Sequence, residues 1–294
     1  MTIKPTLTTA LSNPPLSVGQ SATLACLLEI TAPKPGNVHR AADFEDVGFV
    51  DFAASAVVIG PAMESAADVG VGPAILSAVT ATRTVVETNT NLGIVLLLAP
   101  LAAVGSGVPT HHRIQTVLSN LDAGDARDVY RAIGVAQPSG MGAVREMDLR
   151  DTPPQNLLHA MAAAAEHDLI ARQYVNGLQE VFELVVPDLF EGLQRGWALS
   201  DATIHTQLVL MSGHGDSLVE RKCGPAVARQ LATRASEVLA SGEPTDSSYR
   251  QSLSDLDFWL RCDGHRRNPG TTADLITAGL YVLLRDGRLK APFS

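Results

Sequence analysis

The stretch 155–190 reads QNLLHAMAAAAEHDLIARQYVNGLQEVFELVVPDLF, and it decides the fold class. Alanine, leucine, glutamine and glutamate, all good helix formers, make up much of its first half. Its apolar residues recur at helical spacing rather than in strand-like alternation. We therefore expect two helices here, the first ending near Tyr174 and the second beginning near Asn176.

The rest of the chain repeats this pattern. Periodic apolar positions predict further helices over 18–30, 49–63, 73–87, 114–121, 126–135, 200–211, 226–239 and 253–261, and a last helix ending at Leu284. No segment shows convincing strand alternation, and no repeat of fixed period is present. The sequence predicts an all-α protein, with a single globular multi-helix domain over 18–294 and a flexible N-terminal arm, rich in Thr, Pro and Ser, over 1–17.

Composition and charge exclude several classes of protein. The formal net charge of −9 argues against non-specific nucleic-acid binding. Cys26, Cys223 and Cys262 form no CxxC pair, which favours reduced thiols over disulfides or zinc ligands. The N-terminus lacks a signal-peptide core, and the most apolar run, 92–104, is too short to span a bilayer. We expect a soluble cytoplasmic protein without nucleic-acid or membrane partners, and its apolar helices suit a homodimer.

A polar loop, TAPKPGNVHRAADFED, spans 31–46. Pro33 and Pro35 bias the residues before them towards extended backbone, and Gly36 widens the range of backbone angles. The loop then displays, in chain order, Lys34, Asn37, His39, Arg40, Asp43, Glu45 and Asp46. Cations followed closely by carboxylates suit a substrate that carries phosphates and a metal ion. The alternative is a polar connection between two helices with an acidic N-cap.

Three further polar loops each lie next to a predicted helix start. They read TNTNLG at 88–93, SGHGDS at 212–217 and NPGTTAD at 268–274. Their candidate ligands, with two cations that follow the second loop, are Asn89, Asn91, Asp216, Arg221, Lys222, Asn268, Gly270, Thr271 and Asp274. Helix N-termini offer free N–H groups and the positive end of the helix dipole, and Arg and Lys bind phosphate. These loops predict an enzyme that binds a polyphosphate in one pocket.

Asp168 and Arg172 lie four residues apart, just after the alanine run 162–165. An exposed ion pair is the simplest interpretation. However, small alanines let a neighbouring helix approach closely, and a partly buried carboxylate suits a metal ion or a general base. The segment 137–152, rich in Gly, Pro and Met, is interpreted as a mobile flap over a site or as a long connector.

Four segments resemble, in the same order, the triphosphoribosyl-dephospho-CoA synthase family: PKPGNV at 33–38, TNTNLG at 88–93, GDS at 215–217 with Arg221 and Lys222, and NPGTTAD at 268–274. The resemblance covers residues 19–288. It implies an all-helical transferase that takes ATP and 3′-dephospho-CoA and releases adenine. The product is the precursor of the prosthetic group of citrate lyase or malonate decarboxylase acyl carrier proteins. ATP is expected to bring Mg²⁺.

Three of these motifs depart from those of the best-known members. Those read KPGLVD, DTN followed by RGG, and SPGGSADLL, where this chain has KPGNVH, DSL followed by RKCG, and NPGTTADLI. The chain looks closer to a divergent branch found in archaea and in bacteria that make methanopterin-type one-carbon cofactors. An alternative function is therefore a related nucleotide- or phosphate-dependent enzyme of methanopterin- or methanofuran-type cofactor biosynthesis. A non-catalytic helical binding module and a structural scaffold are the non-enzymatic alternatives.

The reaction that the resemblance implies is glycosyl transfer at C1′ of the ATP ribose. A nearby carboxylate would stabilise the oxocarbenium-like transition state, and a carboxylate would accept the proton of the acceptor hydroxyl. The predicted catalytic residues are Asp43, Glu45, Asp168 and Asp216. The predicted substrate-binding residues are Lys34, Asn37, His39, Asn89, Asn91, Arg221, Lys222, Asn268, Gly270 and Thr271. The predicted Mg²⁺ ligands are Asp216 and Asp274, and the sequence leaves open which carboxylate does what.

Overall fold

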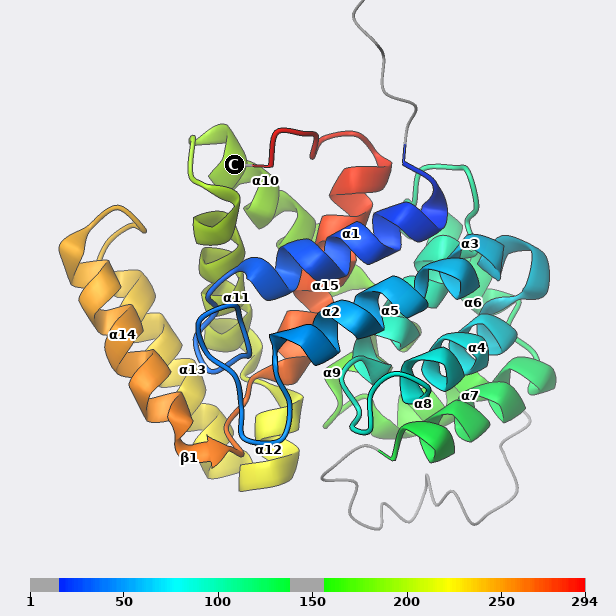
Figure 1. Ribbon diagram of the computed structural model, residues 1–294, viewed down its shortest axis with the longest axis horizontal. Coiled ribbons are helices and arrows are strands. Elements are labelled where there is room, and N and C mark those ends of the chain that lie inside the picture. The colour runs from blue at the N-terminus through cyan, green and yellow to red at the C-terminus, as the bar shows by residue number, and fades with distance from the viewer. Residues whose placement is uncertain (1–15, 138–155, 294) are drawn as a thin grey trace, which may run out of the picture.

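The computed structural model describes residues 16–137 and 156–293 (Figure 1). Their regular structure is helical apart from one four-residue extended segment, so the predicted all-α fold is confirmed. The elements are α1 (Val18–Thr31), α2 (Phe49–Val58), α3 (Gly60–Val69), α4 (Val71–Arg83), α5 (Leu92–Ala102), α6 (His111–Ser119), α7 (Ala123–Ala136), α8 (Leu157–Ala164), α9 (Leu169–Asn176), the π-helical turn η1 (Val181–Val185), α10 (Val186–Gln194), α11 (Leu199–His214), α12 (Ser217–Cys223), α13 (Pro225–Ala240), α14 (Ser247–Arg261), β1 (Cys262–His265) and α15 (Gly270–Arg285).

Local capping chemistry sets many of the helix starts. The Ser17 hydroxyl accepts the Gln20 N–H while the Gln20 side chain accepts the Ser17 N–H, which forms a capping box at the start of α1. Asp122 caps α7 in the same way. Pro225 occupies the first turn of α13, where a missing N–H costs no helical hydrogen bond. The predicted arm over 1–17 falls almost wholly outside the described residues, as does most of the predicted flap over 137–152.

The helix expected over 49–63 is longer than predicted and is interrupted. It continues to Val69 and divides into α2 and α3 at Ile59, because Pro61 has no N–H to bond the preceding turn. By length and composition alone this 21-residue stretch passes as a membrane span, with 39% of its most apolar window buried in the protein. Core helices of other proteins also meet this criterion of length and composition, so the stretch is only weak evidence for a membrane span.

The stretch 155–190 is also more divided than predicted. The helix expected to run to Tyr174 breaks after α8, because the Asp168 carboxylate caps a new helix there. Its Oδ1 accepts the N–H groups of Ile170 and Ala171 at 2.8 and 3.1 Å. Farther on, the π-helical turn η1 precedes α10. The short helix α12 was not predicted; it follows Gly215, whose φ of 67° suits glycine.

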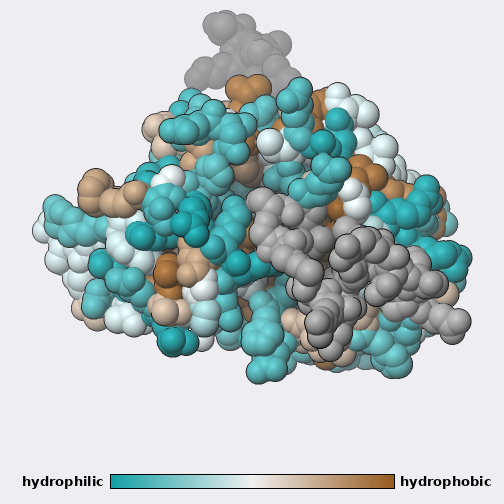
Figure 2. All heavy atoms as spheres, turned by 90° about the horizontal axis from the view of Figure 1, so that it is seen from below, coloured by the Kyte–Doolittle hydropathy of each residue, from teal (hydrophilic) through white to brown (hydrophobic). Residues whose placement is uncertain are grey.

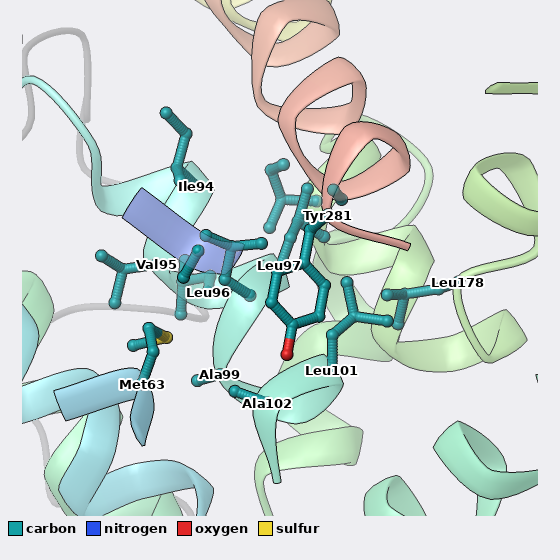
Figure 3. Packing of buried hydrophobic residues seen from close by; sticks show 14 of the residues in the cluster. Met63, Ile94, Val95, Leu96, Leu97, Ala99, Leu101, Ala102, Leu178 and Tyr281 are labelled. Carbon is teal, nitrogen blue, oxygen red and sulfur yellow. The ribbon is translucent and has the colours of Figure 1, made fainter. Parts of the chain in front are cut away.

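Two clusters of buried apolar side chains hold the helices together. The larger cluster surrounds α5 and α15; every residue of α5 except Gly93 is buried. Figure 3 shows Leu97 and Leu101 of α5 lying beside Tyr281 of α15. The smaller cluster joins α11, α12, α13 and α14, which stand at one side of the molecule in Figure 1. The N-terminal ends of α12 and α15 lie where these two parts of the molecule meet.

Candidate active site

A cleft of about 450 Å³ lies where the N-termini of α5, α9, α12 and α15 converge. Residues of their first turns line it, as do parts of the loops over 31–46, 88–93 and 268–274. The first N–H groups of a helix lack intrahelical partners and carry the positive end of its dipole. The cleft therefore favours anions despite the net charge of −9. Seen from below, the molecule carries many hydrophilic side chains on its surface (Figure 2).

Asp216 joins two of these helix N-termini. Its Oδ1 accepts the N–H groups of Leu218 and Val219 at 2.9 and 3.2 Å, and its Oδ2 accepts the N–H of Thr272 at 2.8 Å. The residue is 1% exposed, and burial raises the pKa of its carboxyl to about 6 although these hydrogen bonds oppose the rise. It does not line the cleft. Its placement suits a positioning role better than the catalytic and metal-binding roles predicted for it.

Asp274, in the first turns of α15, lines the cleft. Its carboxylate lies so close to Gly93 of α5 that a Cβ at position 93 would clash with it. Within the described ranges no hydrogen-bond donor reaches its oxygens. Burial, followed by the charges of Asp216, Glu29 and Asp168, raises its pKa well above the usual range. Asp274 is thus a carboxylate that binds a proton readily at the floor of the cleft.

Lys34 lies behind the wall of the cleft. It is fully buried, its Nζ lies 2.6 Å from Glu29 Oε1, and the same Nζ donates to the Glu29 carbonyl at 2.8 Å. Glu29 lines the cleft, whereas Lys34 does not. Opening a buried ion pair leaves two uncompensated charges. This placement favours Lys34 as the partner of Glu29 over the direct phosphate contact predicted for it.

An amide network holds the loop over 33–38 against α15. Asn37 Nδ2 donates to Asn268 Oδ1 at 2.6 Å, and Asn37 Oδ1 accepts from Gln207 Nε2 at 2.7 Å. Arg261 adds a hydrogen bond to the Asn37 carbonyl at 2.6 Å. Asn37 and Asn268 both line the cleft, as predicted for substrate-binding residues, but their amides are already paired with each other. Gln207 was missed because nothing in the sequence around it marks a polar position of α11 as buried.

Arg221 and Lys222 of α12 line the cleft. Arg221 forms an ion pair with Asp168 at 3.1 Å, which ties α12 to the cap of α9. Burial, and next the charge of Arg221, lowers the pKa of Lys222. The ion pair expected between Asp168 and Arg172 is wrong: Arg172 lies 3.6 Å from Glu180 instead. Asp168 does not pair with Arg172 because the helix breaks before α9. Asp168 caps α9, and its second carboxylate oxygen contacts Arg221 of α12.

The α5 and α15 starts contribute the remaining predicted ligands. Asn89 Oδ1 accepts the Leu92 N–H at 3.0 Å, and Asn91 Nδ2 donates to Thr82 Oγ1 at 3.1 Å. Both asparagines line the cleft, together with Gly270 and Thr271. These side chains fix the shape of the helix starts, and the N–H groups of those starts remain the feature that suits an anion.

Besides Asp216 and Lys34, three predicted residues do not line the cleft. Asp43 Oδ1 accepts the Phe49 N–H at 2.7 Å and so supports the start of α2. Glu45 is exposed, and His39 accepts the Ala41 N–H at 3.3 Å within its own loop. Their placement favours neither the catalytic roles predicted for Asp43 and Glu45 nor the substrate contact predicted for His39.

Sequence reasoning missed other residues that do line the cleft. They include Glu29, Phe44, Arg83 and His265. The rings of Phe44 and His265 lie 5.2 Å apart between centroids, one from the loop over 31–46 and one from β1. Glu29 sits on an apolar helix and Arg83 ends an amphipathic one, so neither carries a motif. Only their place in the folded chain identifies them.

A preformed metal centre is absent from the described part of the chain: no group of three His, Cys, Asp or Glu side chains is arranged to hold an ion. The cleft floor still offers carboxylate oxygens, the ligand type that Mg²⁺ prefers, from Glu29 and Asp274. Isolated carboxylates fit an ion that arrives with a phosphorylated substrate, because the phosphates then supply most of its ligands.

A cleft with helix N-termini at its walls and a proton-binding carboxylate at its floor is typical of an enzyme that acts on phosphorylated compounds. The family can be named more closely. A model of the family described as ATP:dephospho-CoA triphosphoribosyl transferase matches residues 15–293, and the chain belongs to that family. It is therefore a transferase of the triphosphoribosyl-dephospho-CoA synthase type, and the predicted family and function are confirmed. The alternative in methanopterin- or methanofuran-type cofactor biosynthesis is not favoured.

Individual relatives agree with this assignment. Proteins from two strains of Vibrio cholerae serotype O1, each named "Probable 2-(5''-triphosphoribosyl)-3'-dephosphocoenzyme-A synthase", are 29% identical over 289 residues, which cover 90% of this chain and 86% of theirs. A crystal structure from Archaeoglobus fulgidus, described as a candidate triphosphoribosyl-dephospho-CoA synthase, matches with a TM-score of 0.60 and 24% identity. The match covers 80% of this chain and 99% of that one, and it supports the fold.

Proposed function

We propose that the cleft holds ATP and 3′-dephospho-CoA together and that Asp274 is the base that activates the acceptor hydroxyl. The placement of Asp274 carries this proposal. It lies on the cleft floor, no donor among the described residues reaches its oxygens, and its pKa is raised, first by desolvation and then by neighbouring carboxylates. A base works best when its pKa lies near the working pH, and a raised carboxyl pKa moves in that direction.

In the proposed reaction the bond between C1′ of the ATP ribose and adenine breaks, and adenine leaves with the electron pair and takes up a proton. The acceptor hydroxyl oxygen forms the new bond to C1′, and its proton passes to Asp274. Positive charge develops on the ribose as adenine leaves. In the proposed reaction the Asp274 carboxylate lies beside this position, and its negative charge stabilises the transition state.

The triphosphate is assigned to the N-terminus of α15, with Arg221 and Lys222 as its cations. Charge-assisted hydrogen bonds to phosphate are stronger than neutral ones. The pairing of Arg221 with Asp168 orients the guanidinium before a ligand arrives. Lys222 has a depressed pKa because it is partly buried, and a phosphate beside it would restore the stability of its charged form.

Mg²⁺ belongs to the proposal as a companion of the triphosphate. Glu29 is the cleft carboxylate that would help to hold it, through the oxygen that is not paired with Lys34, because Asp274 is assigned as the base. The ion would neutralise phosphate charge that the helix N-termini leave uncompensated. The prediction of Asp216 as a metal ligand is not carried forward, because its oxygens accept three backbone N–H groups.

The test is mass spectrometry of the products after the purified protein is incubated with ATP, Mg²⁺ and 3′-dephospho-CoA. We expect one adenine per molecule of 3′-dephospho-CoA that gains a triphosphoribosyl group. Incubations without the acceptor, or with GTP in place of ATP, are the controls. Adenine release that does not depend on the acceptor, or no product from any of a panel of nucleoside acceptors, would contradict the proposed transfer.

A further inference from the structure

We infer that Arg83 forms a second phosphate-binding point in the cleft and that it binds the diphosphate of the acceptor, while Arg221 and Lys222 bind the triphosphate of ATP. The inference rests on the proposed function, because it needs both substrates in this cleft at once. It adds a specificity residue on an element to which the sequence motifs assigned no cation.

The position of Arg83 is the first support. It is the last residue of α4 and lines the cleft with Glu87, Thr88 and Asn89 of the α4–α5 loop. Among the described residues, none forms a hydrogen bond or ion pair with its guanidinium. Arg221 and Lys222 belong to α12, and Figure 1 shows α12 lying apart from α4, which ends at Arg83. The cations that line the cleft therefore come from two separate helices rather than from one patch.

Thr88 gives an independent indication that an anion binds beside Arg83. Its Oγ1 is buried without a hydrogen-bond partner in the described part of the chain, and the residue lines the cleft. A buried hydroxyl without a partner is unfavourable, and a phosphate oxygen would accept its hydrogen bond. The N-terminus of α5 begins four residues later and also faces the cleft. A cation, a hydroxyl and a helix N-terminus thus converge.

Charge decides which substrate takes which end. The triphosphate of ATP carries more negative charge than the diphosphate diester of 3′-dephospho-CoA. The end at α12 offers two cations, Arg221 and Lys222, whereas the end at α4 offers one, Arg83, beside the N-terminus of α5. The more charged group goes to the more positive end. Asp274 lies against Gly93 at the start of α5. In this arrangement ATP and 3′-dephospho-CoA approach the reacting carbon beside Asp274 from opposite directions.

The experiment compares Arg83→Gln with Lys222→Gln in adenine-release kinetics, varying ATP and 3′-dephospho-CoA separately. For Arg83→Gln we expect the KM for 3′-dephospho-CoA to rise about 10- to 100-fold, as for one lost charge-assisted hydrogen bond. Its KM for ATP should change less than about 3-fold, within the usual spread of distant changes. Lys222→Gln should show the reverse. Arg229→Gln, an exposed arginine on α13, should match the wild type.

A truncated acceptor distinguishes a specific contact from a general loss of structure. Adenosine offers the ribose hydroxyl without the diphosphate, so Arg83→Gln and the wild type should use it equally well. Calorimetric binding of 3′-dephospho-CoA, without ATP, should weaken by the same factor as the KM. The inference is overturned if Arg83→Gln raises the KM for ATP instead, or lowers turnover of adenosine equally. Wild-type protein that binds 3′-dephospho-CoA through Arg83 but releases no adenine would contradict the proposed reaction and leave the Arg83 contact standing.

Discussion

Asp216 is the N-cap of α12 and Asp274 is the fifth residue of α15, and the surroundings of the two aspartates differ. Asp216 accepts three backbone N–H groups and lies outside the cleft, whereas Asp274 lines the cleft without a described donor. Both have raised pKa values, and desolvation of the charged carboxylate is the largest cause for each. The difference teaches that hydrogen-bond partners, rather than residue type or a perturbed pKa, separate a positioning carboxylate from a reacting one.

The largest effect that this comparison predicts is in the Asp274→Asn variant. We expect kcat for adenine release to fall about 10²- to 10⁴-fold, the usual contribution of a general base. The melting temperature should stay the same or rise, because a neutral amide is easier to bury than a charge. Steady-state kinetics and thermal unfolding measure the two quantities. Turnover close to that of the wild type would contradict the assignment of Asp274 as the base.

Asp216→Ala tests the other side. It leaves the N–H groups of Leu218, Val219 and Thr272 without their acceptor, so we expect a loss of about 2–3 kcal/mol in the free energy of unfolding. Urea titration measures this loss. Asp216→Asn retains one acceptor oxygen and should recover part of it. If Asp216→Asn were as inactive as Asp274→Asn while fully stable, Asp216 would be a reacting group as well.

The pH dependence of stability sharpens the comparison further. The Asp216 carboxyl has a folded-state pKa of about 6, above the unfolded value, so the folded state binds its proton more tightly. Its contribution to stability therefore rises as pH falls through 6. Between pH 7 and pH 5 the wild type should gain about 1 kcal/mol relative to Asp216→Asn. Urea titrations of both proteins across this range measure it, and parallel curves would contradict the assigned pKa.

The smallest effect is expected for Glu45→Gln. Glu45 was predicted as catalytic from the sequence, yet it is exposed and does not line the cleft. Exposed charges contribute little, so kcat and KM should stay within about twofold of the wild type. A loss of kcat as large as that of Asp274→Asn would show that Glu45, and with it the loop over 31–46, takes part in the reaction.

Much of the fold follows from local patterns, and the site does not. Runs of helix-forming and apolar residues placed both ends of α1 and of α13 within one residue, because helix propensity and helix breakers are local features of the sequence. It missed the break before α9, since Asp168 reads equally well as a surface charge or as a cap. The same ambiguity hid the difference between Asp216 and Asp274, which depends on partners far away in sequence.

Cation placement shows the same limit. Lys34 lies in the most conspicuous motif of the chain, yet its ammonium forms an ion pair with Glu29 on the preceding helix. Arg83 stands in no motif, yet it lines the cleft. The cytoplasmic location, the homodimer and the absence of nucleic-acid and membrane partners stay predictions from the sequence.

The close contact between Gly93 and Asp274 limits how substrates can enter the cleft and how adenine can leave it. At that point α5 and α15 leave no width for even a methyl group. In the proposed reaction, with C1′ of the ribose beside Asp274, this contact closes that side of the cleft, and adenine is expected to leave on the side from which the nucleotide entered. A second substrate bound on that side would block the departure of adenine. The close packing of α5 against α15 would then set the order in which the two substrates bind.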